Sequence, residues 1–179
     1  DEDVESDMYL AAIDRLAEAG YEQYEISNFA RPGQACLHNM TYWRHEPYVG
    51  VGPSACGCVD GVRYKNIASV EGYTRRMEEF GDAVAESEHV TGATLAGEAV
   101  MMQLRLNEGI DVGAFLRTTG IDPLARCRQT LERFAELGVM NVSDATLSLT
   151  RRGRLVADAI ISDLFAELHS PPESVCGVA

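Results

Sequence analysis

The sequence predicts an α/β segment followed by a mostly helical domain with a winged-helix-like hairpin, so the fold class is α/β plus α+β. A helix, a glycine and a strand follow one another over residues 6–29, the order found in the repeating unit of parallel sheets. Apolar residues recur at helical spacing through most of the chain after residue 69. Two β-rich runs, residues 139–142 and 147–149, predict a hairpin before the last helix. Because only one helix–strand unit is present, we expect residues 1–29 to be the tail of a larger α/β domain.

Composition and charge narrow the classes of function. Of the 179 residues, 46% are hydrophobic, so a packed core is expected. The formal net charge is 15 − 28 = −13, which disfavours binding to nucleic acid and to anionic membranes. No apolar run approaches the ~20 residues of a membrane span, so no stable membrane insertion is expected. The acidic start, residues 1–5, lacks the features of a signal peptide, and we expect a cytoplasmic protein.

Caps and breakers define the first elements. Ser6 is the predicted N-cap of a helix that ends at Gly20. Residues 21–29 alternate and carry Tyr, Ile and Phe, which predicts one strand. An Arg-Pro-Gly sequence then breaks the strand, and residues 36–47 are predicted to be irregular.

The middle of the chain predicts a hairpin and a helix. The Asp-Gly pair within residues 59–66 indicates a two-residue type I′ turn. Ser69 is the predicted cap of a helix that ends near Phe80, and residues 81–88 are predicted to be an acidic linker.

The last part of the chain predicts further helices, each with a cap or a breaker: residues 91–109, residues 112–118 after an Asp111 cap, residues 123–138 after a proline, and a final helix after Thr150. The two predicted strands lie before that final helix. From Pro171 onward we expect a frayed tail.

Five cysteines share no regular spacing: Cys36, Cys56, Cys58, Cys127 and Cys176. Their odd number and the C-x-C pair argue against a disulfide framework and against a zinc knuckle. Reduced thiols are therefore expected. The C-x-x-x-C-x-x-C motif is absent from the sequence.

An ordered set of motifs carries a family resemblance: Tyr24-Glu-Ile-Ser-Asn-Phe-Ala30, Arg31-Pro-Gly33, His38-Asn-x-x-Tyr-Trp43, Tyr48-Val-Gly-Val-Gly-Pro-Ser-Ala55, Arg63-Tyr-x-Asn66, Met101-Met-Gln-Leu-Arg-Leu-x-Glu-Gly-Ile110 and Leu149-Thr-x-x-Gly153. Together they cover most of residues 8–168. The sequence resembles the oxygen-independent coproporphyrinogen III oxidase-like branch of the radical SAM family, and specifically its heme chaperones.

The resemblance implies a partial (β/α) barrel with a [4Fe-4S] cluster and S-adenosylmethionine, followed by a winged-helix-like domain. It assigns the chain as follows: residues 1–66 to the C-terminal end of the barrel and the His-Asn-x-x-Tyr-Trp segment, 67–90 to a helix and acidic linker, 91–169 to a HemN-type C-terminal domain, and 170–179 to a tail. The cluster and S-adenosylmethionine are expected for the full-length family, and the cluster ligands are absent from this chain.

The same resemblance associates His38-Asn-x-x-Tyr-Trp with heme. It implies His38 as the iron ligand, Asn39 as an orienting residue, and Tyr42 and Trp43 as porphyrin contacts. A neutral imidazole ligates heme iron, and aromatic rings offer flat apolar surface to a porphyrin. The alternative is that the two aromatic rings pack at the seam between the domains and that His38 bonds a backbone carbonyl. Cys36 is a rival thiolate ligand or a small buried residue.

Three other segments carry weaker indications. Residues 50–55 form a loop of small residues that either approaches a ligand closely or makes a tight turn. The sequence departs from the family pattern at residues 56–58. Glu25, Ser27 and Asn28 lie near the end of the predicted barrel strand, where barrel sites form, and the alternative for Glu25 is half of an ion pair within the sheet.

The remaining polar candidates are expected at the surface: His45, His89, His169 and the arginines Arg151, Arg152 and Arg154. Winged helices often bind DNA, but the acidic balance of the chain argues against it.

The function expected from this resemblance is that of a heme chaperone that binds heme and passes it to an acceptor protein. One alternative is an oxygen-independent coproporphyrinogen III oxidase, and another is an inactive fragment or interaction module. Enzymatic activity of this chain alone is not expected, because the cluster cysteines are missing. The sequence leaves the oligomeric state open.

Overall fold

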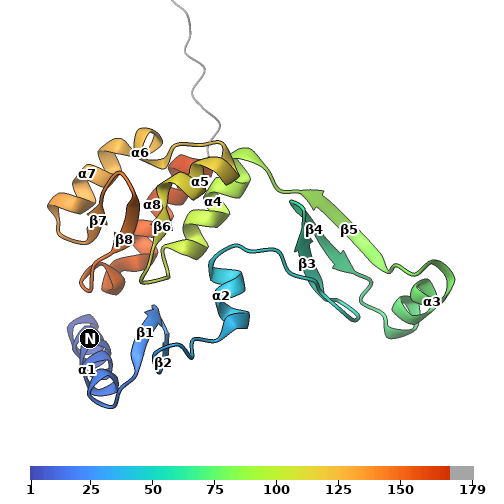
Figure 1. Ribbon diagram of the computed structural model, residues 1–179, viewed down its shortest axis with the longest axis horizontal. Helices are drawn as coiled ribbons and strands as arrows, with labels where there is room; N and C mark the ends of the chain where they lie inside the picture. Colours follow the sequence, from blue (N-terminus) through green and yellow to red (C-terminus); the bar gives the residue numbers. More distant parts are fainter. Residues whose placement is uncertain (170–179) are drawn as a thin grey trace, which may run out of the picture. The chain divides into compact units, whose positions relative to one another are not determined.

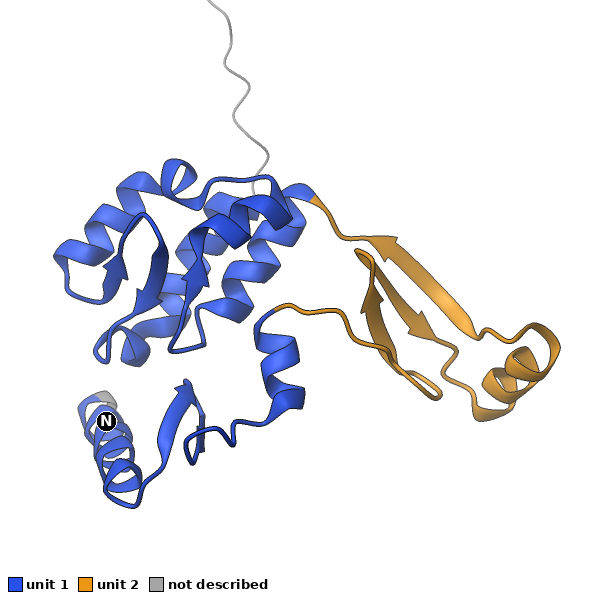
Figure 2. Ribbon diagram, in the orientation of Figure 1, with its two compact units in different colours: residues 1–44, 92–179 blue, residues 45–91 orange. Residues whose placement is uncertain are grey.

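The computed structural model describes residues 1–169 (Figure 1). The chain forms two compact units, one of residues 1–44 together with the chain from residue 92, and one of residues 45–91 (Figure 2). The predicted tail from Pro171 lies outside the described residues. No helix within the described part of the chain is long and apolar enough to cross a membrane.

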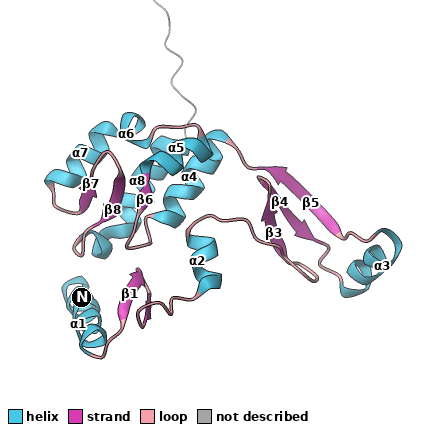
Figure 3. Cartoon of the chain, in the orientation of Figure 1, coloured by secondary structure: helices cyan, strands magenta, loops and turns pink. Residues whose placement is uncertain are grey.

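The first unit contains most of the helices (Figure 3). In chain order its elements are α1 (Glu2–Glu18), β1 (Glu22–Glu25), β2 (Asn28–Ala30), α2 (Leu37–Trp43), α4 (Gly92–Gln103), β6 (Ile110–Asp111), α5 (Val112–Thr119), α6 (Pro123–Arg126), α7 (Arg128–Glu136), β7 (Met140–Val142), β8 (Thr146–Leu149), the 3₁₀ helix η1 (Gly153–Val156) and α8 (Ala157–His169). The second unit contains β3 (Cys56–Val59), β4 (Val62–Asn66), α3 (Val70–Phe80) and β5 (Val84–His89).

The predicted single strand over residues 21–29 is wrong, because β1 and β2 form an antiparallel hairpin. The Glu25 carboxylate accepts hydrogen bonds from the Ser27 backbone N–H at 2.8 Å and from the Asn28 side-chain amide at 2.5 Å. These bonds hold the turn that reverses the chain. Within residues 1–169 the strands form three small antiparallel sheets and no barrel.

The predicted irregular segment, residues 36–47, contains the helix α2, so that prediction is also wrong. Seven residues give a helix little stability of their own. The burial of Met40 stabilises it, and the Gln103 side chain donates to the Arg44 carbonyl at 3.3 Å beyond its last turn. Tertiary contacts therefore form this helix, and local propensity does not.

The core of the first unit lies around α4 and α8, whose buried faces meet the sheet of order β6-β8-β7. The predicted cap is confirmed, since the Asp111 carboxylate accepts from the Ala114 N–H at 2.6 Å. The two strands predicted over residues 139–142 and 147–149 are confirmed as β7 and β8. The sequence did not predict β6, which has only two residues.

The helix predicted over residues 123–138 is divided at Cys127 into α6 and α7. The Cys127 thiol is buried in the core of the first unit. Burial, together with the nearby Glu167 carboxylate, raises the pKa of the Cys127 thiol to about 12.

The second unit is a three-stranded sheet, β3-β4-β5, with α3 between its last two strands in sequence. The predicted hairpin is confirmed, with positive φ at both Asp60 and Gly61, as a type I′ turn requires. The Ser69 cap of α3 is also confirmed, because its hydroxyl accepts from the Gly72 N–H at 3.1 Å.

The acidic linker predicted for residues 81–88 is instead largely β5, paired with β4. Opposite charges face each other across this pair. Arg63 lies opposite Glu88, with a 2.8 Å ion pair, and Lys65 lies opposite Glu86. The charges of the acidic run are therefore complementary to those of the neighbouring strand β4. The sequence of the run alone does not show this, because the partner charges lie on another segment.

We expect Gly153→Ala to lower the free energy of unfolding by about 1–3 kcal/mol, because a Cβ at residue 153 would overlap the Val139 carbonyl. Gly113→Ala is the control. That glycine is exposed on α5, where a Cβ meets the flexible end of Arg117 and, at an ordinary contact distance of 3.5 Å, the Asp111 carboxylate, and alanine should stabilise by about 0.5–1 kcal/mol. Urea denaturation measures both, and equal effects would contradict the packing described.

We expect the Cys127 thiol to be inert to an aromatic disulfide reagent at pH 8 in the folded protein, because the thiolate is the reactive form and this thiol is buried with a raised pKa. Cys127→Ala should leave the native thiol titre unchanged and lower the titre in denaturant by one. A lower native titre in that variant would show that Cys127 is accessible.

Candidate functional site

The helix α2 places the four predicted heme-binding residues on two different sides. His38 and Tyr42 are one helical turn apart, and their rings meet edge to face with centroids 4.9 Å apart. His38 is exposed and Tyr42 is half-buried. An exposed imidazole beside an aromatic ring can bind a metal centre that approaches from solvent.

Asn39 and Trp43, also one turn apart, make contacts within the unit instead. The Asn39 amide donates to the Tyr24 hydroxyl at 3.3 Å. The Trp43 ring lies under the Arg105 guanidinium, whose carbon is 4.6 Å from the ring centroid. The structure thus brings His38 together with Tyr42, and places Asn39 and Trp43 against β1 and the end of α4.

A buried ion pair holds Arg105 in place. The Glu25 side chain is fully buried, and its Oε2 lies 3.3 Å from the Arg105 Nη2. The same nitrogen lies 3.5 Å from the Ser27 hydroxyl. Glu25 is therefore one half of an ion pair, as the alternative proposed, but its partner Arg105 lies directly after α4 and not within the sheet. Ser27 and Asn28 belong to the turn that surrounds this carboxylate.

The backbone after α4 runs beside the β1–β2 hairpin and brings Arg105 to Glu25. The Ile26 N–H donates to the Arg105 carbonyl, and the Asn107 N–H donates to the Tyr24 carbonyl, both at 3.1 Å. A two-pronged ion pair between Arg44 and Glu108, at 2.7 and 3.0 Å, ties the end of α2 to the same segment. The hairpin, α2 and residues after α4 form one connected structure.

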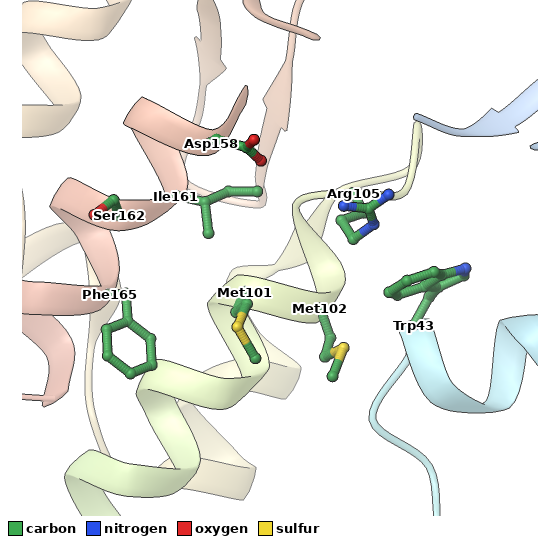
Figure 4. Close-up of a pocket in the computed structure, with 8 residues that line it drawn as sticks. All are labelled: Trp43, Met101, Met102, Arg105, Asp158, Ile161, Ser162 and Phe165. Carbon is green, nitrogen blue, oxygen red and sulfur yellow. The ribbon is translucent and has the colours of Figure 1, made fainter. Parts of the chain in front are cut away.

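A pocket of about 470 Å³ lies beside this structure (Figure 4). Its lining residues come from α2, α4 and α8 and from the segment directly after α4: Trp43, Met101, Met102, Arg105, Asp158, Ile161, Ser162 and Phe165. Most of the lining is aromatic or aliphatic, with one cation and one anion. Met101, Met102 and Arg105 belong to one of the sequence motifs, but the sequence did not predict that they line a pocket. The only indication available was that Arg105 is a lone arginine in an apolar run.

The other candidate segments of the sequence are an exposed cysteine and a tight turn. Cys36 is exposed and precedes α2. In the loop of residues 50–55, the Asn66 amide donates to the Gly50 and Gly52 carbonyls, at 3.3 and 3.0 Å. Gly52 has a φ of 105°, so this loop is a tight turn.

The cysteines of residues 56–58 lie on β3, and within residues 1–169 no group of three or more His, Cys, Asp or Glu residues could hold a metal ion. His89 is exposed, His45 is half-buried, and His169 is exposed and stacks on Phe165 with ring centroids 5.1 Å apart.

The arginines beside the hairpin of β7 and β8 make contacts inside the first unit. Arg151 pairs with Asp14 at 2.7 Å, and Arg154 donates to the Gln23 side chain at 2.7 Å. Arg154 is half-buried, in contrast to the surface position expected for it, and this burial lowers the pKa of its guanidinium. Two of the three arginines are therefore engaged with α1 and β1.

Residues 90–156 match the family described as the HemN C-terminal domain. The chain is 30% identical to the heme chaperone HemW of Bacillus subtilis over 92% of this chain and 43% of that protein, and 33% identical to HemW of Mycobacterium tuberculosis over 92% and 40%. It is 29% identical to the mitochondrial radical S-adenosyl methionine domain-containing protein 1 of Danio rerio, over 94% and 40%. The chain thus spans about two fifths of the length of these relatives.

Among solved structures, the coproporphyrinogen III oxidase HemN of Escherichia coli, described as a radical SAM enzyme, is similar in fold. The TM-score is 0.62 at 20% identity, over 87% of this chain and 39% of that one. The chain has the mixed helix and sheet architecture of the matching part of that enzyme.

We expect Glu25→Gln to lower the free energy of unfolding by about 1–3 kcal/mol, because the amide would turn an N–H towards a cation in a buried site. Glu108→Gln is the matched control: it also removes an arginine partner, but an exposed one, and should cost less than about 1 kcal/mol. Urea denaturation followed by the fluorescence of Trp43, the only tryptophan, measures both. Equal effects would contradict the structural role of Glu25.

Proposed function

We propose that this chain, which belongs to the family of radical SAM proteins that includes HemW and HemN, binds heme and passes it to an acceptor protein. The relatives from Bacillus subtilis and Mycobacterium tuberculosis, which match over 92% of the chain, are named heme chaperones, and this supports heme binding over porphyrin oxidation. Because the chain spans about two fifths of those relatives, the activity of the whole protein is part of the proposal.

The observation that carries the proposal is the exposed His38 on α2 with the half-buried Tyr42 beside it. The His38 side chain is exposed, and its ring packs edge to face with the Tyr42 ring, with the two centroids 4.9 Å apart. A neutral imidazole nitrogen is a common axial ligand of heme iron. Tyr42 restricts the orientations that the imidazole can adopt and adds apolar surface beside it.

The residues described here do not fit a [4Fe-4S] cluster. Such a cluster requires several cysteine thiolates close together, and within residues 1–169 no cluster of metal-ligating side chains is present. We therefore derive no radical step for this chain. Heme enters the proposal as cargo, which needs an exposed ligand and a route for release.

We expect titration with hemin to give a Soret band that differs from that of free hemin. This difference should weaken strongly in His38→Ala, because the iron loses its axial ligand. His89→Ala is the matched control, since His89 is an exposed histidine on β5 in the other unit, and it should behave as the unaltered protein. An identical spectrum for His38→Ala would overturn the ligand assignment.

A further inference from the structure

We infer that the pocket beside α2 binds the carboxylate edge of a porphyrin, with Arg105 as the cation that holds one propionate. The inference rests on the proposed heme binding and adds a specific residue to it. His38 and Tyr42 do not line this pocket, so it is a separate contribution from iron ligation.

The shape and composition of the pocket fit part of a flat apolar ring. Its volume of about 470 Å³ lies within the usual range of roughly 300–1,000 Å³ for ligand pockets. Trp43 offers a planar surface on one side (Figure 4). Met101, which is 38% exposed, and Met102 offer flexible thioethers, which pack well against aromatic rings. Phe165 adds a second ring.

Arg105 is prepared to bind a carboxylate. Its contacts with Glu25 and Ser27 are made by Nη2, and its Nε is buried without a hydrogen-bond partner in the part of the chain that the structure describes. The side chain retains 25% exposure. A guanidinium has five N–H donors whose planar arrangement matches a carboxylate. Because Glu25 and Trp43 already fix its orientation, little side-chain entropy is lost on binding.

The second charged group of the pocket sets the expected stoichiometry. Asp158, in the first turn of α8, also lines the pocket and repels a carboxylate. One cation and one anion favour a single propionate at Arg105 over two in the same pocket. A neutral side chain at residue 158 should therefore strengthen binding of a carboxylate, whereas binding of a ligand held only by apolar contacts should not change.

The test compares protoporphyrin IX with its dimethyl ester, which has the same ring without ionised carboxylates. Neither contains iron, so His38 ligation plays no part, and quenching of Trp43 fluorescence reports binding. We expect Arg105→Leu to weaken binding of the free acid about tenfold and Asp158→Asn to strengthen it about two- to threefold. Binding of the ester should change in neither variant.

Arg105→Leu leaves the Glu25 carboxylate without its partner, so the double variant Glu25→Gln/Arg105→Leu is measured as well and should lose the same affinity for the free acid. Asp158→Asn tests the inference without touching that ion pair. Arg63→Leu, in the other unit, is the control for loss of any one arginine.

Equal loss of acid and ester binding in Arg105→Leu, or no quenching by either porphyrin, would overturn the inference. The hemin spectrum of His38→Ala remains a separate measurement. A difference between acid and ester that depends on Arg105 upholds this assignment even if His38 proves not to ligate iron.

Discussion

The Glu25–Arg105 pair is the interaction on which the rest of the first unit depends. A fully buried carboxylate is costly in free energy unless it is paired and hydrogen-bonded. Glu25 meets this condition through the Ser27 N–H, the Asn28 amide and the Arg105 guanidinium. The first two bonds close the β1–β2 turn, and the third connects that turn to the chain directly after α4. One carboxylate thus fixes both a local turn and a contact between segments 80 residues apart.

The position of Trp43 follows from this pair. Arg105 lies over the indole ring, so the orientation of the guanidinium sets where the end of α2 can pack. Helical spacing then determines on which side of α2 the other motif residues lie. Asn39 is one turn before Trp43 and contacts Tyr24, while His38 and Tyr42 take the other side. The helix therefore divides the motif into two pairs: Asn39 and Trp43, which contact other parts of the unit, and His38 and Tyr42, whose rings contact each other.

Local chemistry determined what could be predicted from the sequence. The Ser69 and Asp111 caps, the Asp60-Gly61 turn and the hairpin of β7 and β8 depend on neighbouring residues, and all were predicted correctly. The strand β5 and the helix α2 depend on segments distant in sequence, and those predictions failed. The turn between β1 and β2 was also missed, although neighbouring residues hold it through the Glu25 carboxylate.

The same limit applies to the candidate site. The family resemblance carried by the His-Asn-x-x-Tyr-Trp motif pointed to the segment that forms α2 as the candidate site. The sequence could not place Arg105 against Trp43, because 62 positions separate them and only the fold joins them. Nor could it choose between a ligand-binding and a structural role for Glu25, since the choice depends on a partner far along the chain.

The net negative charge of the chain has only a small effect on electrostatics within the pocket. A net charge of −13 repels a ligand with carboxylates at long range. At physiological ionic strength the Debye length is about 8 Å, so distant exposed acids are largely screened. Arg105 is mostly buried and is screened much less, and only Asp158 shares its pocket as an anion. For the inferred binding of a carboxylate, affinity would therefore be set by Arg105, its partner Glu25 and Asp158, and the overall charge would act mainly on the rate at which the ligand arrives.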